Sequence, residues 1–176
     1  MTATDAIKCL YKYIDDLPIK YQHLCAPVLL DKSFQESPGG VTRHHQYKHG
    51  LIVHTGEVMN NAMKMAYLLP LDLKNILTVA TLWHDYMKTV EYSMNEQGEI
   101  ITTAYRRTMG HLTGSVLAFQ TEALKQKIEE SFYVPVIHCM LSHHGVREWG
   151  SPVEPQTAEA TILHAADMMS MKGIIL

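Results

Sequence analysis

The sequence has no excess of positive charge and no long hydrophobic run, and each absence excludes a class of protein. Lys and Arg number 15 against 18 Asp and Glu, a formal net charge of -3. This balance excludes a protein that wraps a nucleic-acid duplex through a broad basic field, although not a local basic groove. No apolar run reaches the roughly 18 residues of a membrane span, and the N-terminus does not resemble a secretion signal. We therefore expect a cytoplasmic protein with no membrane attachment.

Cysteine and the large aromatic residues are also scarce. The chain has 3 Cys, 3 Phe and 2 Trp. The cysteines, at Cys9, Cys25 and Cys139, are odd in number, widely spaced and set among apolar neighbours. That pattern predicts neither a disulfide framework nor a zinc finger, and we interpret the three as core thiols in a reducing compartment.

The length and the apolar periodicity predict one helical domain. The chain has 176 residues, of which 47% are hydrophobic, enough to bury a single core. Apolar residues recur at intervals of three and four, and the helices so predicted cover about 6–17, 20–30, 50–69, 72–88, 110–130, 135–142 and 155–171. Polarity alternates around Asn95-Glu96-Gln97-Gly98, which is typical of a short β-hairpin. We predict an all-α fold of about seven helices with one small hairpin insertion.

Histidine is abundant, with 11 residues. Any one histidine beside apolar neighbours is more typical of a hydrogen-bonded core residue than of a metal ligand, but several recur with aspartate at the predicted helices. These residues are His54 in GLIVHTGEV, His84 and Asp85 in LWHDYMK, His111 after Gly110, His143 and His144 in LSHHG, and Asp167 in LHAADMM. Imidazole nitrogen with carboxylate oxygen suits Mn, Fe, Co, Zn or Ni, whereas Mg prefers oxygen ligands throughout.

The ordered pattern H…HD…H…HH…D resembles the signature of the HD-domain metalloenzymes. The segments SPGGVTRHHQYKHGLIVHT and SHHGVREWGSPVEPQTAEATILHAADMM resemble, more closely, the HD domain of the YhaM-type 3′-to-5′ exoribonucleases. The resemblance covers about residues 34–172. It implies a single HD domain over 1–176, with its metal-binding core within 34–172.

The resemblance also implies a ligand set for two divalent metal ions. It assigns His54, His84, Asp85 and Asp167 to one ion, and Asp85, His111 and His143 to the other. Adjacent helical residues point about 100° apart, so we expect Asp85 to reach across a groove and bridge the ions. His144 is either a further ligand or an acid to the leaving oxygen.

Several other residues are candidates for the surroundings of the metal ions. Lys88 lies one helical turn after His84 and could meet a substrate phosphate, with a solvated lysine as the alternative. Arg106, Arg107 and Arg147 are loop cations that could also contact phosphate. Glu57 could ligate a third ion or support the ligands, and His164, one turn from Asp167, fits such a supporting role.

These residues predict a metal-dependent phosphohydrolase, either a phosphodiesterase or a nucleotidase. Metal-activated water would attack a nucleotide, a cyclic nucleotide or a short RNA or DNA oligonucleotide, with Asp85, Lys88 and His144 as the catalytic residues. The alternatives are an HD-type di-iron oxygenase, which uses the same ligand types, and a non-catalytic regulatory domain. A homodimer is left open.

Overall fold

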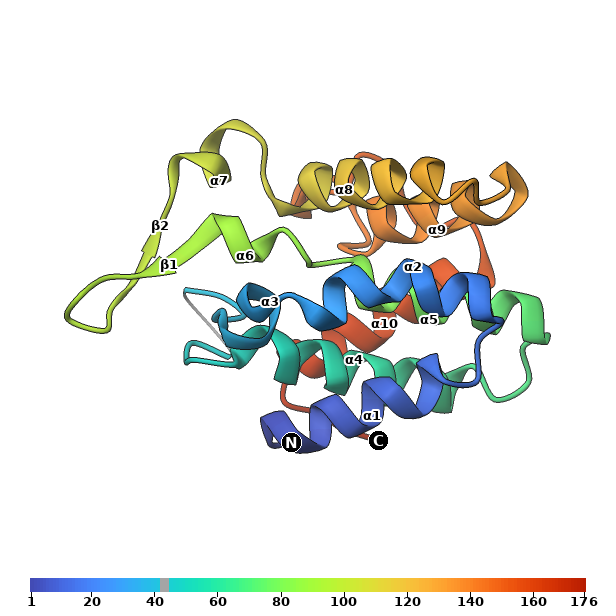
Figure 1. The fold of residues 1–176 in the computed structure, drawn as a ribbon, viewed down its shortest axis with the longest axis horizontal. Helices are drawn as coiled ribbons and strands as arrows, with labels where there is room; N and C mark the ends of the chain where they lie inside the picture. Colours follow the sequence, from blue (N-terminus) through green and yellow to red (C-terminus); the bar gives the residue numbers. More distant parts are fainter. Residues whose placement is uncertain (42–44) are drawn as a thin grey trace.

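The computed structural model describes residues 1–41 and 45–176, and helices make up most of them (Figure 1). In chain order the helices are α1 (Ala3–Ile14), α2 (Ile19–Leu30), α3 (Lys32–Glu36), α4 (Gly50–Met65), α5 (Leu71–Trp83), α6 (Lys88–Glu91), α7 (Ala104–Thr108), α8 (His111–Lys125), α9 (Glu130–Ser142), the 3-10 turn Arg147–Trp149, and α10 (Ala158–Met171). The strands β1 (Tyr92–Met94) and β2 (Ile100–Thr102) pair antiparallel, with Tyr92 opposite Thr102, and form a hairpin that projects from the helical body. The predicted all-α class with one small hairpin is confirmed.

Helix α4 lies at the centre of the packing. It contacts α1 on one side and α10 and α5 on the other, while α5 and α10 also contact α9 (Figure 1). Helix α1 begins at a capping box in which the Thr2 hydroxyl accepts from the Asp5 backbone N–H and the Asp5 carboxylate accepts from that of Thr2. Its buried residues Ala6, Leu10 and Ile14 share one face. Burial on both sides holds α4 firmly and therefore fixes the position of His54.

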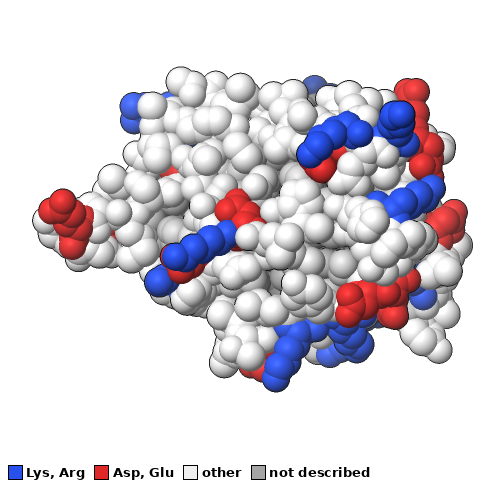
Figure 2. Space-filling model, in the orientation of Figure 1, with Lys and Arg blue, Asp and Glu red and all other residues white. Residues whose placement is uncertain are grey.

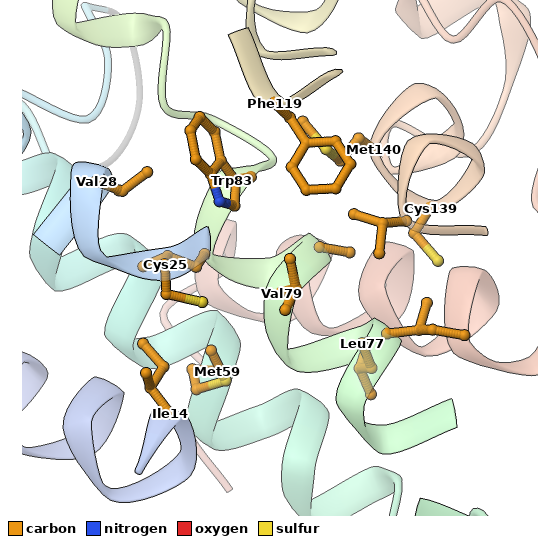
Figure 3. Packing of buried hydrophobic residues seen from close by; sticks show 14 of the residues in the cluster. Ile14, Cys25, Val28, Met59, Leu77, Val79, Trp83, Phe119, Cys139 and Met140 are labelled. Atoms are coloured by element: carbon orange, nitrogen blue, oxygen red, sulfur yellow. The ribbon is translucent and has the colours of Figure 1, made fainter. Parts of the chain in front are cut away.

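The hydrophobic core extends to the last residue of α5 (Figure 3). The Trp83 ring packs edge-on against Phe119, with 5.7 Å between ring centroids, and its Nε1–H donates to the Leu24 carbonyl at 3.3 Å. Trp83 immediately precedes His84 and Asp85, so core packing fixes the chain where this pair begins. Cys25 and Cys139 are buried free thiols, in keeping with the core role expected for them.

Helix boundaries differ from the prediction in two places. Helix α5 ends at Trp83 instead of continuing to about Lys88, because residues 84–87 form a turn. Helix α9 begins at Glu130 instead of Pro135, which lies inside the helix. The missing proline N–H leaves the carbonyl of Ser131 without its helical partner, but Ser131 is exposed, so that water can take the place of the N–H. The helices α3, α6 and α7 have five, four and five residues, too few to show a period.

The surface carries mixed charge. On the face drawn in Figure 2, and for the residues that the structure describes, Lys and Arg side chains are interspersed with Asp and Glu and form no continuous basic patch. No helix within 1–41 and 45–176 combines the length and apolar character needed to cross a bilayer.

Candidate metal centre

Side chains from five separate segments meet beside the core. His54 lies in α4, His84 and Asp85 directly follow α5, His111 begins α8, His143 and His144 directly follow α9, and Asp167 lies in α10. Their potential ligand atoms form two groups, each within 4.8 Å: His54, His84, Asp85 and Asp167 in the first, and His111, His143 and His144 in the second. The structure thus brings together all seven side chains that the sequence predicts as ligands.

Asp85 lies between the two groups and turns one carboxylate oxygen toward each. Its Oδ2 lies 3.3 Å from His54 Nε2 and 3.4 Å from His84 Nε2. Its Oδ1 lies 3.3 Å from His111 Nε2 and 3.7 Å from His143 Nε2. Asp85 is buried, with 1% of its surface exposed. Its two oxygens could therefore serve as ligand atoms in both groups.

The histidines are oriented by what their Nδ1 atoms contact. In four of the histidines, Nδ1 lies beside an oxygen that can only accept a hydrogen bond. The pairs are His84 with the Thr81 carbonyl (2.7 Å), His143 with the Met140 carbonyl (2.6 Å), His144 with the Trp149 carbonyl (2.9 Å) and His111 with Glu91 Oε1 (3.1 Å). Each Nδ1 therefore carries the hydrogen, and in the neutral ring the Nε2 lone pair faces the centre. This tautomer leaves Nε2 able to bind a metal ion.

Several potential ligand atoms of the second group lack a hydrogen-bond donor. His111 Nε2 lies 3.3 Å from His144 Nε2, and in the neutral rings both carry a lone pair. Asp85 Oδ1 and His143 Nε2 are buried and make no hydrogen bond within the described part of the chain. Buried lone pairs that face one another are unfavourable unless a cation lies between them. The donor set and its spacing therefore fit divalent cations of the borderline transition series.

Protonation differs between the two groups. Burial opposes a charge on His54, but its hydrogen bonds to Asp167 and Asp85 outweigh burial and raise its pKa to about 9. Burial, together with the neighbouring His144 and His84, holds the pKa of His143 well below its usual value. Burial also opposes a charge on Asp85, but Lys88 and the nearby histidines hold the pKa of that carboxyl well below its ordinary range. In the metal-free protein, a proton on His54 thus serves as the cation of the first group.

Glu91 supports the second group and was not predicted from the sequence. Its Oε1 accepts hydrogen bonds from both the backbone N–H and the Nδ1–H of His111, and its side chain is buried. Burial raises the pKa of Glu91, but the contacts with His111 outweigh it and lower the pKa. In the sequence Glu91 lies at the start of the polar hairpin segment, where nothing distinguishes it from a surface glutamate.

Glu57 and Ser170 support the first group. The Ser170 hydroxyl donates to Glu57 Oε2 at 2.8 Å and, because it has only one hydrogen, accepts from His54 Nδ1 at 3.0 Å. Glu57 also lies 3.1 Å from His45 Nε2. Glu57 thus lies behind His54 rather than among the grouped ligand atoms, an arrangement that favours the supporting role over a third ion. Ser170 carried no signal in the sequence.

His164 supports the second group through the backbone. Its Nδ1–H donates to the His143 carbonyl at 2.8 Å. Its ring also packs against Gly145, where an added Cβ would lie 2.3 Å from His164 Cε1. Gly145 has φ +88°, so this turn after His143 and His144 has both the backbone conformation and the lack of space that require glycine.

Two cavities open onto the centre. The larger, of about 480 Å³, is lined by Asp85, Lys88, His143, His144, Trp149, Asp167, Met168 and Met171. The smaller, of about 150 Å³, includes Lys88, Arg106, His54 and His111 in its lining. Lys88 forms an ion pair with Asp85 and lines both cavities.

The three predicted arginines differ in position. Arg106 lies over the Tyr92 ring, 5.5 Å from its centroid, and lines the smaller cavity. Arg107 and Arg147 are exposed and line neither cavity. The structure therefore places Arg106, rather than the other two, where it could meet a phosphate near the centre.

The fold and the grouped histidines and aspartates are those of one class of protein, and the chain belongs to the HD domain family, whose model matches residues 51–172. It is similar to the 3′-5′ exoribonuclease YhaM of Bacillus velezensis (32% identical over 145 residues), of Bacillus subtilis (31% over 144) and of Listeria innocua (33% over 138). These alignments cover 81%, 81% and 77% of this chain but 45%, 45% and 43% of the relatives, so the chain spans less than half their length. No solved structure gives a significant match. The resemblance predicted from the motifs is confirmed.

Proposed function

We propose that this chain is a metal-dependent phosphohydrolase that cleaves a phosphate ester of a nucleotide, a cyclic nucleotide or a short oligonucleotide. His54, His84, Asp85 and Asp167 would hold one ion, and Asp85, His111, His143 and His144 the other. The observation that carries the proposal is the buried Asp85 carboxylate, with one oxygen turned toward each group of imidazole nitrogens. Mn, Fe, Co, Zn and Ni suit these ligands better than Mg.

The charge of the centre favours phosphate chemistry. Bound divalent ions supply a water of lowered pKa and neutralise charge on the attacking and leaving oxygens. Two carboxylates offset only part of the charge of two such ions, which leaves the site attractive to an anion. Lys88 adds to this attraction, because Asp85 and Asp167 outweigh the effect of burial and raise its pKa, so that it stays charged.

Lys88 and His144 have distinct roles in this proposal. Lys88 lines both cavities beside Asp85, where its ammonium group would orient a phosphate oxygen. Burial and the neighbouring His111 lower the pKa of His144, and its Nδ1–H is held by the Trp149 carbonyl. A neutral His144 with its Nε2 lone pair beside His111 suits a ligand better than an acid to the leaving oxygen.

The substrate class rests on two observations. The relatives carry the name 3′-5′ exoribonuclease, which supports a ribonucleotide phosphodiester, although the chain matches less than half of each. The larger cavity, of about 480 Å³, is within the range of pockets that enclose a small ligand, about 300–1,000 Å³. We therefore propose a mononucleotide or the end of a short oligonucleotide as the substrate.

A metal-dependence experiment tests the proposal. The purified protein is stripped with a chelator, reloaded singly with Mn, Fe, Co, Zn or Mg, and assayed on mononucleotides, cyclic nucleotides and short RNA. We expect hydrolysis with a transition metal, and its fall to background in Asp85→Asn with an unchanged far-ultraviolet circular dichroism spectrum. The matched control is Asp72→Asn, which removes an exposed carboxylate from α5 and should retain both metal and activity.

The other outcomes of that experiment overturn the proposal. Consumption of O2 by the iron-loaded protein, without ester hydrolysis, would support an oxygenase. Binding of two ions with no turnover of any ester would support a regulatory domain. Hydrolysis that persists in Asp85→Asn would remove the shared carboxylate from the mechanism.

A further inference from the structure

The larger cavity has walls of two kinds. Asp85, Lys88, His143, His144 and Asp167 form its polar end, where the proposed metal ions and the scissile phosphate would lie. Trp149, Met168 and Met171 supply the apolar part of the same lining. The catalysis of phosphate hydrolysis does not need this apolar surface. Its position beside the phosphate suggests that it contacts another part of the substrate.

Trp149 is held in place by the same elements that hold the candidate ligands. It ends the 3-10 turn Arg147–Trp149, and its carbonyl accepts a hydrogen bond from His144 Nδ1 at 2.9 Å. Gly150 follows with φ +99°, which turns the chain sharply after the ring. The Trp149 ring lies 6.4 Å from the His164 ring, centroid to centroid. Its orientation is therefore coupled to the second group of histidines.

The exposure of Trp149 sets it apart from the other tryptophan. Trp149 is 56% exposed, whereas Trp83 is 2% exposed and packs in the core. An indole that is fixed by its backbone and open to a cavity offers a flat surface that a ligand can cover. Aromatic side chains in such positions stack on nucleobases without regard to base identity, because every base has a π-face.

Met168 and Met171 complete the wall from α10. Met168 directly follows Asp167, and Met171 lies one helical turn further along the same helix. Both are half-buried. Their thioether groups are polarizable and adapt to ligands of different shape. An apolar surface that begins one residue from a candidate metal ligand lies within the reach of a nucleoside whose phosphate is at the metal ions.

We propose that Trp149, Met168 and Met171 form a nucleobase subsite, with the base stacked on the indole ring. This inference rests on the proposed phosphohydrolase function and specifies its substrate as a nucleoside phosphate ester. The base lies in the larger cavity, because the smaller cavity, of about 150 Å³, is well below the usual size of a pocket for such a ligand. Apart from the indole N–H and the polar end, the described lining offers no hydrogen-bonding group to a base edge. Purines and pyrimidines should therefore both be accepted.

Kinetics on paired substrates test the subsite. The metal-loaded protein is assayed on a ribodinucleotide and on the same compound with an abasic sugar at the 3′ end. We expect Trp149→Ala to raise KM for the complete dinucleotide by about 5- to 150-fold, the range expected for one stacked base. KM for the abasic compound should change little, and Trp149→Phe should retain most of the preference for a base.

A matched control removes an exposed aromatic side chain elsewhere. Tyr67 is 76% exposed and follows the end of α4 opposite to His54. Tyr67→Ala should leave the kinetics on both compounds unchanged. An equal loss on the complete and abasic compounds in Trp149→Ala would assign the ring a purely structural role and overturn the subsite.

A binding measurement separates the subsite from the proposed function. Adenosine 5′-monophosphate is titrated into the metal-loaded protein while tryptophan fluorescence is followed, with ribose 5-phosphate as the ligand without a base. We expect saturable quenching by the nucleotide only, and its loss in Trp149→Phe, which retains the buried Trp83. If no ester is hydrolysed but this quenching is seen, the hydrolase proposal fails and the base subsite stands. If the nucleotide quenches neither protein, or both equally, the subsite is overturned even where hydrolysis is found.

Discussion

Glu91 holds His111 at two points, because its Oε1 accepts from both the backbone N–H and the imidazole Nδ1–H of that residue. Glu91 ends α6 at the base of the hairpin, and His111 is the first residue of α8. A carboxylate at this point satisfies a free N–H at the helix start and interacts favourably with the helix dipole. It also fixes the His111 tautomer, so that Nε2 faces Asp85 Oδ1 at 3.3 Å. The hairpin insertion thereby helps to position the second group of histidines.

Loss of the Glu91 carboxylate should weaken metal binding at the second group, which contains His111, more than at the first. We expect Glu91→Gln to lower the affinity for the ion held by the second group by about 10- to 100-fold, the usual effect of losing a carboxylate partner of a ligating histidine. Isothermal titration calorimetry of the metal-free protein with Mn or Zn measures this change. Glu96→Gln, at the exposed hairpin tip, is the control. Two ions bound with unchanged affinity in Glu91→Gln would contradict the positioning role.

The hydroxyl of Ser170 should matter far more than that of another buried helical serine. Ser170→Ala leaves His54 Nδ1 without its acceptor and Glu57 with one donor fewer, and each buried group so affected costs about 1–3 kcal/mol. Among the described residues, the hydroxyl of Ser142, which is also fully buried, hydrogen-bonds only to carbonyls of its own helix, so Ser142→Ala should change the free energy of unfolding by less than about 1 kcal/mol. Urea denaturation of the metal-free protein compares the two variants. Equal losses would mean that Ser170 does not link Glu57 to His54.

Metal binding should compete with the proton on His54. Because hydrogen bonds to Asp167 and Asp85 outweigh burial and raise its pKa to about 9, His54 is charged at neutral pH in the metal-free protein. The apparent affinity for the first ion should therefore rise about tenfold per pH unit up to about pH 9 and then level off. Calorimetry in buffers of different ionisation enthalpy should detect about one proton released when the ion of the first group binds near pH 7. No proton release would rule out a protonated His54.

The same pKa shift sets the pH dependence of stability without metal. The folded pKa of His54 lies above the ordinary value of 6.5, so folding favours the protonated form. Its stabilising contribution is complete below about pH 6.5 and is lost as the pH rises toward 9. The unfolding temperature of the metal-free protein should fall over that interval, whereas that of the metal-loaded protein should not.

The sequence indicated the histidines and aspartates that the structure groups together, but not the residues that hold them in place, and the reason is physical. Candidate ligands belong to a few residue types, and they stand at predicted helices, so their order was enough to indicate a common site. Glu91 and Ser170 act through hydrogen bonds to residues 20 and 116 positions away, and no local pattern reports such contacts. The sequence did not distinguish Arg106 from Arg107 for the same reason, because only the tertiary structure shows which arginine lines the smaller cavity. Helix ends such as Trp83 and Glu130 depended on tertiary packing that outweighs local signals.

Alanine should be tolerated less well at Gly145 than at Gly98, although both glycines have a positive φ. Gly98 has φ +80° and open space around it, so Gly98→Ala should cost only the left-handed conformation, about 1–2 kcal/mol. Gly145→Ala adds a clash with the His164 ring and should cost about 1–3 kcal/mol more. Thermal denaturation measures both. Because the turn follows His143 and His144 directly, metal affinity should also fall in Gly145→Ala and not in Gly98→Ala.

Arg106 and Arg107 offer a matched pair for the smaller cavity, since they are adjacent in α7 and carry the same charge. Both side chains are exposed, but Arg106 lies over Tyr92 and lines that cavity with Lys88, whereas Arg107 lines neither cavity. A hydrogen bond to a charged group contributes about 1.5–3 kcal/mol, so Arg106→Ala should raise KM for a nucleotide ester by at least about tenfold. Arg107→Ala should change it less than about twofold at 0.15 M salt, where exposed charges are screened beyond about 8 Å.

Inhibition by inorganic phosphate makes this comparison independent of the nucleobase. The inhibition constant should rise in Arg106→Ala by a factor similar to that for KM, because both depend on the same phosphate contact. It should stay unchanged in Arg107→Ala and in Trp149→Ala, whose ring contacts the base and not the phosphate. If Arg107→Ala instead gave the larger effect, substrate would approach from the exposed side of α7, and the smaller cavity would have no part in phosphate binding.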